Sequence, residues 1–140
     1  LYKSLADLTW SDPDNVKKFI PNRRGSGYPF GPEQTFSFLY RNGLIKGSRD
    51  PNTQIFTDNT KIKTMKRGFI ARAHQLAQEG YQWFHNDNLC IVWSAPNYAY
   101  KNNNKATFLT VKQEEAYFTE FLPHPESKDK PDDALLDYFA

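Results

Sequence analysis

The sequence predicts a mixed α/β fold, because helical and strand-like patterns occupy different parts of the chain. Helical patterns lie within the first 45 residues, whereas short apolar runs of strand length follow from residue 69 onward. The chain has 140 residues, which is the size of one domain, and it contains no internal repeat. We therefore expect one α/β domain, with helices preceding and flanking a set of strands.

Two segments of the first 45 residues have the features of helices. Leu1, Leu5 and Leu8 recur at helical spacing, which predicts a short helix or a connecting segment over 1–10. A second helix is expected to begin at Pro32, since proline suits the first helical position. Gly43 can end it in a left-handed cap. Its expected apolar face consists of Phe36, Leu39 and Tyr40.

Five short strands are expected in the second half of the chain, over 69–73, 81–84, 89–93, 106–111 and 116–122. The run 89–93 is apolar at consecutive positions, which is typical of a strand buried on both faces. The polar residues 85–88 predict a turn before it, and the short link 113–115 predicts a hairpin between the last two strands.

Two polar stretches interrupt or follow these elements. Residues 46–66 lack a sustained hydrophobic period and contain glycine, proline and asparagine, so we expect a surface loop there. From residue 123 the chain is rich in proline and charge, which predicts a flexible carboxyl-terminal tail over 123–140.

Composition argues against two classes of partner. The formal net charge is +2, but 46–67 holds six basic and two acidic residues, so the rest of the chain carries −2. A nucleic-acid-binding protein needs a basic face rather than one basic segment. No apolar run approaches the roughly 20 residues that span a bilayer.

The single Cys90 cannot form an internal disulfide, which favours a cytoplasmic or nuclear location.

Three segments each place a reactive side chain at the end of an ordered element. Arg24 stands among glycines and offers a planar fork of donors that matches a phosphate. His74 ends an apolar run and can bind a transition metal, and Tyr98 lies in a turn after the strongest strand. Together they suggest metal-assisted phosphoester chemistry. From the residues alone, a structural histidine, a solvated arginine and a packed tyrosine are the more common interpretations.

These segments and two others resemble, in their order and in their amino-acid sequence, the C-terminal half of the PPP family of serine/threonine protein phosphatases. The likeness is greatest to the type 2A branch. The five matching segments are DLTWSDPD at 7–14, RGSGYPFG at 24–31, RAHQLAQEGY at 72–81, SAPNYAY at 94–100 and DYFA at 137–140. Five motifs in the family's order are far more specific than one short pattern.

The resemblance implies the fold and the activity. It implies the C-terminal part of a metallophosphatase β-sandwich flanked by helices over 1–122, followed by the tail 123–140. The implied activity is hydrolysis of phosphoserine and phosphothreonine by hydroxide held on two divalent metal ions, manganese first, with iron or zinc as alternatives. The family's upstream motifs, which supply most metal ligands and the general-acid histidine, do not occur in these 140 residues. We therefore expect about half of an enzyme, inactive by itself.

The resemblance also implies roles for particular residues. His74 is a ligand of one metal ion, Arg24 a bidentate phosphate clamp, and Tyr98 part of the catalytic cleft. Arg23 replaces a usual proline, and Ala99 replaces a usual non-catalytic cysteine. For the acidic turn with Asp12 and Asp14, a substrate role and a solvated turn are both open. The implied partners are phosphoprotein substrates and scaffold or regulatory subunits of the type 2A kind.

The stretch 45–71 departs most from the family, in which the preceding helix end leads almost directly to the next matching strand. Here 27 residues separate Leu44 from Arg72. Either a tolerated surface insertion or a mis-joined gene model with a translated intron explains them. Two other functions stay open: an inactive fragment or pseudophosphatase that only binds proteins, and a metallophosphoesterase acting on small phosphoesters.

Overall fold

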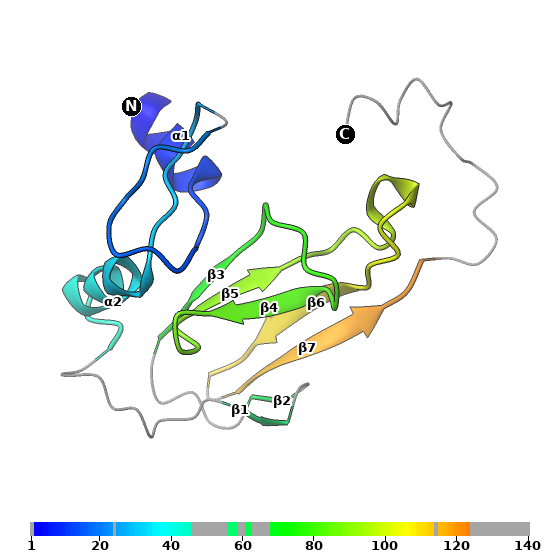
Figure 1. The fold of residues 1–140 in the computed structure, drawn as a ribbon. Helices are drawn as coiled ribbons and strands as arrows, with labels where there is room; N and C mark the ends of the chain where they lie inside the picture. Colours follow the sequence, from blue (N-terminus) through cyan, green and yellow to red (C-terminus); the bar gives the residue numbers. More distant parts are fainter. Residues whose placement is uncertain are drawn as a thin grey trace.

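The computed structural model describes residues 2–23, 25–45, 56–58, 61–62, 68–113 and 115–123. These residues form two α-helices at one side of the molecule, with two β-sheets beside them and a short 3₁₀ helix at the opposite side, so the mixed α/β prediction is confirmed (Figure 1). The helical elements are α1 (Tyr2–Trp10), α2 (Pro32–Arg41) and the 3₁₀ helix η1 (Tyr98–Tyr100). The strands are β1 (Phe56–Asp58), β2 (Lys61–Ile62), β3 (Ile70–Arg72), β4 (Tyr81–Phe84), β5 (Leu89–Val92), β6 (Ala106–Val111) and β7 (Ala116–Phe121).

The two sheets differ in how their strands run. The first has the order β3-β5-β4, in which β5 pairs with β3 in parallel and with β4 in an antiparallel hairpin. The second has the order β1-β2-β7-β6 and is antiparallel throughout. The predicted hairpin between the last two strands is confirmed, with Ala106 opposite Phe121 and Val111 opposite Ala116. The turn predicted at 85–88 joins β4 to β5.

The sheets contact each other through aromatic side chains and backbone hydrogen bonds. The ring of Phe118 on β7 stacks on Tyr81 of β4 at a centroid distance of 4.1 Å and meets Trp83 edge-on at 6.2 Å. Thr107 on β6 donates from its amide to the carbonyl of Trp93 and from its hydroxyl to that of Gly80. This packing gives the layered arrangement of a β-sandwich, as the sequence predicts.

The strand β5 lies at the centre of its sheet and is buried on both faces, as its apolar run predicts. Leu89, Cys90 and Ile91 are all buried, and Leu89 and Ile91 pack with Ala77 in one apolar cluster. Burial raises the pKa of the Cys90 thiol to about 12, so the thiol stays protonated and poorly nucleophilic at neutral pH.

The prediction of a surface loop over 46–66 is wrong for five of its residues. Strand β1 pairs with β2, and β2 pairs with β7, so that this segment extends the edge of the second sheet. Such strands are formed by backbone hydrogen bonds to an open edge, which need no hydrophobic period in the sequence. Residues 46–55, 59–60 and 63–67 lie outside the described residues, as does the predicted tail from residue 124. The boundaries of an insertion at 45–71 stay a prediction.

The helix α2 begins and ends as predicted, but the residues that it buries differ in part from the predicted ones. Pro32 is its first residue, and Gly43 beyond its end has a φ of 67°. Leu39 is fully buried, whereas Tyr40 is 56% exposed, so the predicted apolar face is wrong at Tyr40. Thr35 is buried instead, because its hydroxyl contacts the ring of His85.

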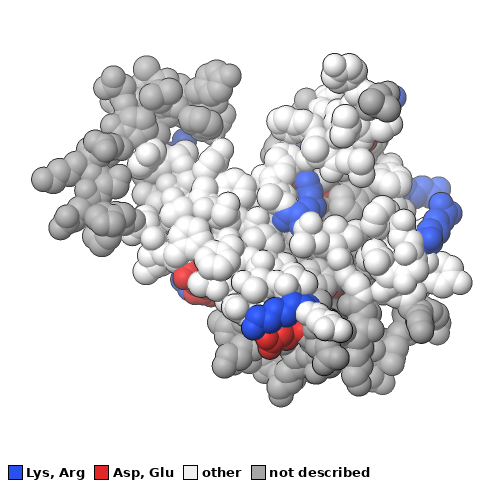
Figure 2. All heavy atoms as spheres, turned by 180° about the vertical axis from the view of Figure 1, so that it is seen from behind, with Lys and Arg blue, Asp and Glu red and all other residues white. Residues whose placement is uncertain are grey.

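Charged side chains are scattered over the back of the molecule. On that face, most basic and acidic residues are separated from one another by uncharged surface. In places a basic residue touches an acidic one (Figure 2). Lys105 makes such a contact, with its amine 2.6 Å from Glu79 and 3.6 Å from Glu120. The hydrogen bond and charge of Glu79, with Glu120, raise the pKa of Lys105. Within the described residues, no helix is long and apolar enough to cross a membrane.

Candidate functional site

Two of the predicted motifs leave the first sheet at the same edge. Strands β3 and β5 are parallel, and Arg72 at the end of β3 is the register partner of Ile91 near the end of β5. His74 therefore follows one strand, and the segment 94–98 follows its neighbour, at their shared carboxyl edge. Loops at the carboxyl ends of adjacent parallel strands commonly form ligand sites.

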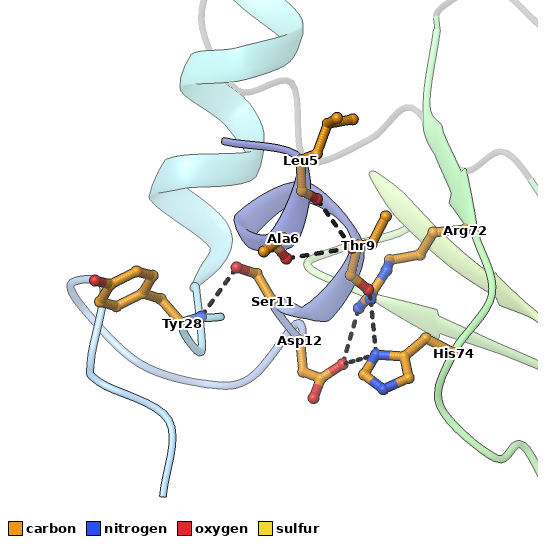
Figure 3. A network of polar contacts seen from close by, with 8 residues as sticks. All are labelled: Leu5, Ala6, Thr9, Ser11, Asp12, Tyr28, Arg72 and His74. Carbon is orange, nitrogen blue, oxygen red and sulfur yellow. Dashed lines mark hydrogen bonds and ion pairs between the residues drawn. The ribbon is translucent and has the colours of Figure 1, made fainter. Parts of the chain in front are cut away.

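A carboxylate from the amino-terminal part of the chain reaches the same place. Helix α1 ends at Trp10, and the following turn brings Asp12 Oδ1 to 3.2 Å from Arg72 Nη1 and 3.1 Å from His74 Nδ1 (Figure 3). The side chains of Asp12 and Arg72 are only 13% and 14% exposed. The three side chains form a compact and largely buried cluster, which we call the Asp12 cluster.

The backbone and ring of His74 are both constrained. His74 has a φ of 83°, a left-handed conformation that non-glycine residues rarely adopt and that often marks functional sites. Trp10 packs edge-on against its imidazole, with 5.0 Å between ring centroids. Arg72 Nη2 donates to the carbonyl of Thr9 at 3.4 Å, which joins the end of α1 to the same cluster (Figure 3).

The contacts of His74 favour one tautomer of its ring. Its Nδ1 lies 3.1 Å from the carboxylate of Asp12 and 3.4 Å from Arg72 Nη2. Donation to Asp12 requires a proton on Nδ1, whereas acceptance from Arg72 requires a lone pair there. The contact with the charged acceptor is shorter, so we assign the proton to Nδ1. A neutral ring then carries its lone pair on Nε2.

The glycine-rich segment after Arg24 is fixed to the turn that carries Asp12. Gly27 has a φ of 69°, and a Cβ there would collide with the carbonyl group of Trp10, so only glycine fits. The amide of Tyr28 donates to Ser11 Oγ at 2.9 Å, and that of Phe30 donates to the carbonyl of Asp12 at 3.0 Å.

Arg24, which we predict to be the phosphate clamp, lies outside the described residues. Its neighbours on both sides are described. The amide of Gly25 donates to the carbonyl of Asn22 at 3.0 Å, and that of Asn22 to the carbonyl of Gly27 at 3.3 Å. These hydrogen bonds bring Asn22 and Gly27 together on either side of the segment that contains Arg24, and the role of Arg24 stays a prediction.

Tyr98 belongs to a second group of contacts beyond the end of β5. Asn97 before it has a φ of 45°, and the amide of Tyr98 donates to Asn104 Oδ1 at 2.8 Å. The Tyr98 ring meets that of Trp93 edge-on at 4.9 Å. The structure thus brings His74 together with Asp12 and Arg72, and holds Tyr98 against Trp93 at the same edge of the sheet.

Sequence reasoning missed part of this site. Asp12 is not a solvated residue, because it is largely buried against Arg72 and His74. Asp14 fits the exposed turn, and its carboxylate accepts from the amide of Asn15 at 2.7 Å. Arg72 was not a predicted site residue, although its position two residues before the candidate ligand His74 was the available signal.

The donor set permits only a partial metal site. Within the described ranges, no three histidine, cysteine, aspartate or glutamate side chains are grouped to hold an ion. His74 offers one imidazole, and the nearby carboxylate of Asp12 already binds Arg72. These residues fit one ligand position of a metal site whose other ligands would come from elsewhere.

The chain is similar to catalytic subunits of protein phosphatases. The chain is 34% identical, over 97% of its length, to a protein phosphatase 2A catalytic subunit of Dictyostelium discoideum. It is 32% identical, over 96% of its length, to the serine/threonine-protein phosphatase 6 catalytic subunit of Caenorhabditis elegans. Its homologues are serine/threonine protein phosphatase catalytic subunits. The chain spans 38% and 34% of the lengths of these two relatives, and no protein-family model matches it.

A solved structure supports the fold. A protein serine/threonine phosphatase from Saccharomyces cerevisiae, described as similar to human phosphatase PP5, matches 84% of the chain and 34% of its own length. The TM-score is 0.57 at 24% identity. The similarity therefore confirms the predicted fold class, the α/β architecture of this phosphatase, and says nothing of the chemistry.

Proposed function

We propose that the chain is part of a protein phosphatase that hydrolyses phosphoserine and phosphothreonine monoesters. The observation that carries this proposal is its similarity, over 97% of its length, to a phosphatase catalytic subunit. The Asp12 cluster at the carboxyl edge of β3 and β5 supports it, because a largely buried carboxylate contacts the ring of His74, the candidate metal ligand, at an edge where ligand sites are common.

Each site residue has a role in this proposal. His74 gives an imidazole to one of two divalent ions, with manganese expected and iron or zinc as alternatives. Such ions, when bound, supply a hydroxide nucleophile and stabilise negative charge on the phosphoryl group. Asp12 orients the His74 ring, as carboxylates behind ligand histidines commonly do. Arg24 binds the phosphoryl oxygens, and Tyr98 lines the cleft.

The proposed partners follow from the same resemblance. They are phosphoprotein substrates together with scaffold or regulatory subunits of the type 2A kind, met in the cytoplasm or the nucleus. A second candidate function is that of a protein-binding module without catalysis. It is favoured by one observation: among the described residues, His74 is the single imidazole joined to a carboxylate at the candidate site.

Phosphate release from a phosphothreonine peptide tests the proposal. In a full-length protein containing this chain, Arg24→Ala should lower kcat/KM on the order of 10²-fold, roughly 3 kcal/mol, since a bidentate phosphate contact strengthens in the transition state. Arg24→Lys keeps the positive charge but lacks the forked donors of a guanidinium group. Its kcat/KM should therefore lie between those of the unchanged protein and of Arg24→Ala. The 140-residue chain alone should show no turnover with added manganese. Near-normal turnover of the Arg24→Ala protein would contradict the proposed clamp, and an inactive full-length protein would favour the binding module.

A further inference from the structure

His85 stands in the turn between β4 and β5 and joins three separate parts of the chain. Its Nδ1 lies 2.8 Å from the hydroxyl of Thr35 on α2, and its Nε2 lies 3.0 Å from the backbone carbonyl of Asp14. Phe30 and Phe84 pack edge-on against the same ring, at centroid distances of 5.9 and 6.2 Å. Both polar atoms and the ring edges of His85 are therefore engaged.

The two contacts define how the His85 ring is protonated. The Asp14 carbonyl can only accept, so Nε2 must carry a proton and donate. In the neutral ring Nδ1 is then an acceptor, and the hydroxyl of Thr35 donates to it. Thr35 is 1% exposed, so its hydroxyl depends on this partner rather than on solvent.

The backbone at His85 is held in an unfavourable conformation. His85, Asn86 and Asp87 have φ values of 55°, 54° and 59°, which makes three successive non-glycine residues left-handed. Such residues persist only where the surrounding structure fixes them. Asn88 contributes, because its side-chain and backbone amides both donate to the carbonyl of His85, at 2.8 and 3.3 Å.

A short path of hydrogen bonds leads from His85 to the candidate metal ligand. His85 holds the carbonyl of Asp14, whose amide donates to the carbonyl of Phe30 at 2.9 Å. The amide of Phe30 donates in turn to the carbonyl of Asp12 at 3.0 Å. Asp12 Oδ1 contacts His74 Nδ1. We infer that His85 is a positioning residue that fixes the Asp12 turn against the sheet and thereby keeps the Asp12 carboxylate beside the ring of His74.

This inference rests on the proposed function for its meaning, because the ring orientation of His74 matters most if that ring binds a metal. The inference itself is tested in the metal-free 140-residue chain. Long-range ¹H–¹⁵N spectra report the ring-nitrogen chemical shifts of each histidine, which respond to a neighbouring carboxylate. Hydrogen exchange reports the protection of the Asp14 and Phe30 amides.

Two variants separate the ring's hydrogen bonds from its backbone preference. His85→Gln keeps a donor and an acceptor near the positions of the ring nitrogens but has no preference for left-handed backbone. His85→Asn tolerates the left-handed backbone but is too short to reach Thr35 and Asp14. Thr35→Val removes only the hydroxyl donor at nearly constant volume.

We expect the His85→Asn chain to show shifted ring-nitrogen signals of His74 and to exchange the Asp14 and Phe30 amides on the order of tenfold faster. The His85→Gln chain should retain both signals. Unchanged signals in the His85→Asn chain, or equal disturbance by His85→Gln, overturn the inference. If His85→Asn does not fold, Thr35→Val carries the test: a smaller change in the same direction supports the inference, and no change overturns it. Because neither signal needs turnover, an inactive full-length protein would contradict the proposed function alone.

Discussion

Asp12 illustrates how one oxygen atom can serve two partners. Its Oδ1 accepts from Arg72 and lies within hydrogen-bond distance of His74, and all three side chains are at least partly withdrawn from solvent. Removal of one partner from such a cluster leaves another charge without compensation, which costs more than the same change at the surface. We therefore expect the negative charge of Asp12 to stabilise the fold and to orient the candidate ligand.

The substitution Asp12→Asn tests the role of this negative charge, because asparagine has nearly the same shape as aspartate. We expect a loss of about 2 kcal/mol in the free energy of unfolding, because hydrogen bonds to a charged group are among the stronger ones. Asp87→Asn is the matched control, since it removes the same charge at a left-handed position that asparagine also tolerates. Urea unfolding of both variants measures the difference. Equal stability of the two would mean that the Asp12 carboxylate is dispensable for the fold.

Among the elements, the segment 25–31 shows how a tight backbone contact fixes the site. Gly27 lies against the end of α1, and the following residues bind the Asp12 turn through backbone hydrogen bonds. Gly25 has a similar left-handed φ of 78°, but a Cβ there would meet nothing within 4 Å. The two glycines therefore differ in packing and not in conformation.

Gly27→Ala should consequently destabilise the chain by at least about 3 kcal/mol, because the backbone must shift to remove the collision with Trp10. Gly25→Ala should cost only about 1 kcal/mol, the ordinary penalty for a left-handed alanine. Thermal or urea unfolding of the two variants gives the comparison. A Gly27→Ala chain as stable as the Gly25→Ala chain would show that the segment is not seated against α1.

The sequence predicts the elements of this fold better than its long-range contacts. Strands β4 to β7 can be predicted from the sequence, since apolar runs and turn residues are local features. The pairing of β1 with β2 and of β2 with β7 cannot, because an edge strand can form through its backbone alone. The burial of Thr35 on α2 goes with a contact between Thr35 and His85, fifty positions apart.

The same distinction applies to the site. The resemblance identified His74 as a candidate ligand, but the Asp12 carboxylate that orients it lies sixty positions from Arg72 in the sequence. No local pattern encodes such a contact, because it depends on how the turn after α1 packs against the end of β3. The role of Arg24 stays a prediction, because the structure does not describe that residue.

For the whole molecule, the contact between the two sheets depends on few aromatic rings. Phe118 is 6% exposed and touches both Tyr81 and Trp83 on the opposite sheet. Phe118→Ala should lower the free energy of unfolding by about 3–5 kcal/mol, as expected for a buried aromatic. Phe121→Ala on the same strand should cost less than about 1 kcal/mol, since Phe121 is 36% exposed. Similar losses in both variants, measured by urea unfolding, would contradict this view of the interface.

The parallel pairing of β3 with β5 also has a consequence for the order of folding. The hairpin β4–β5 closes over a four-residue turn and can form early, whereas β3 must join it from nineteen positions upstream. The contacts from Asp12 to Arg72 and from Asp14 to His85 close still longer loops, of 60 and 71 positions. The candidate site would therefore assemble only after its sheet exists, and partial unfolding would disperse its residues while the hairpin beneath them remains intact.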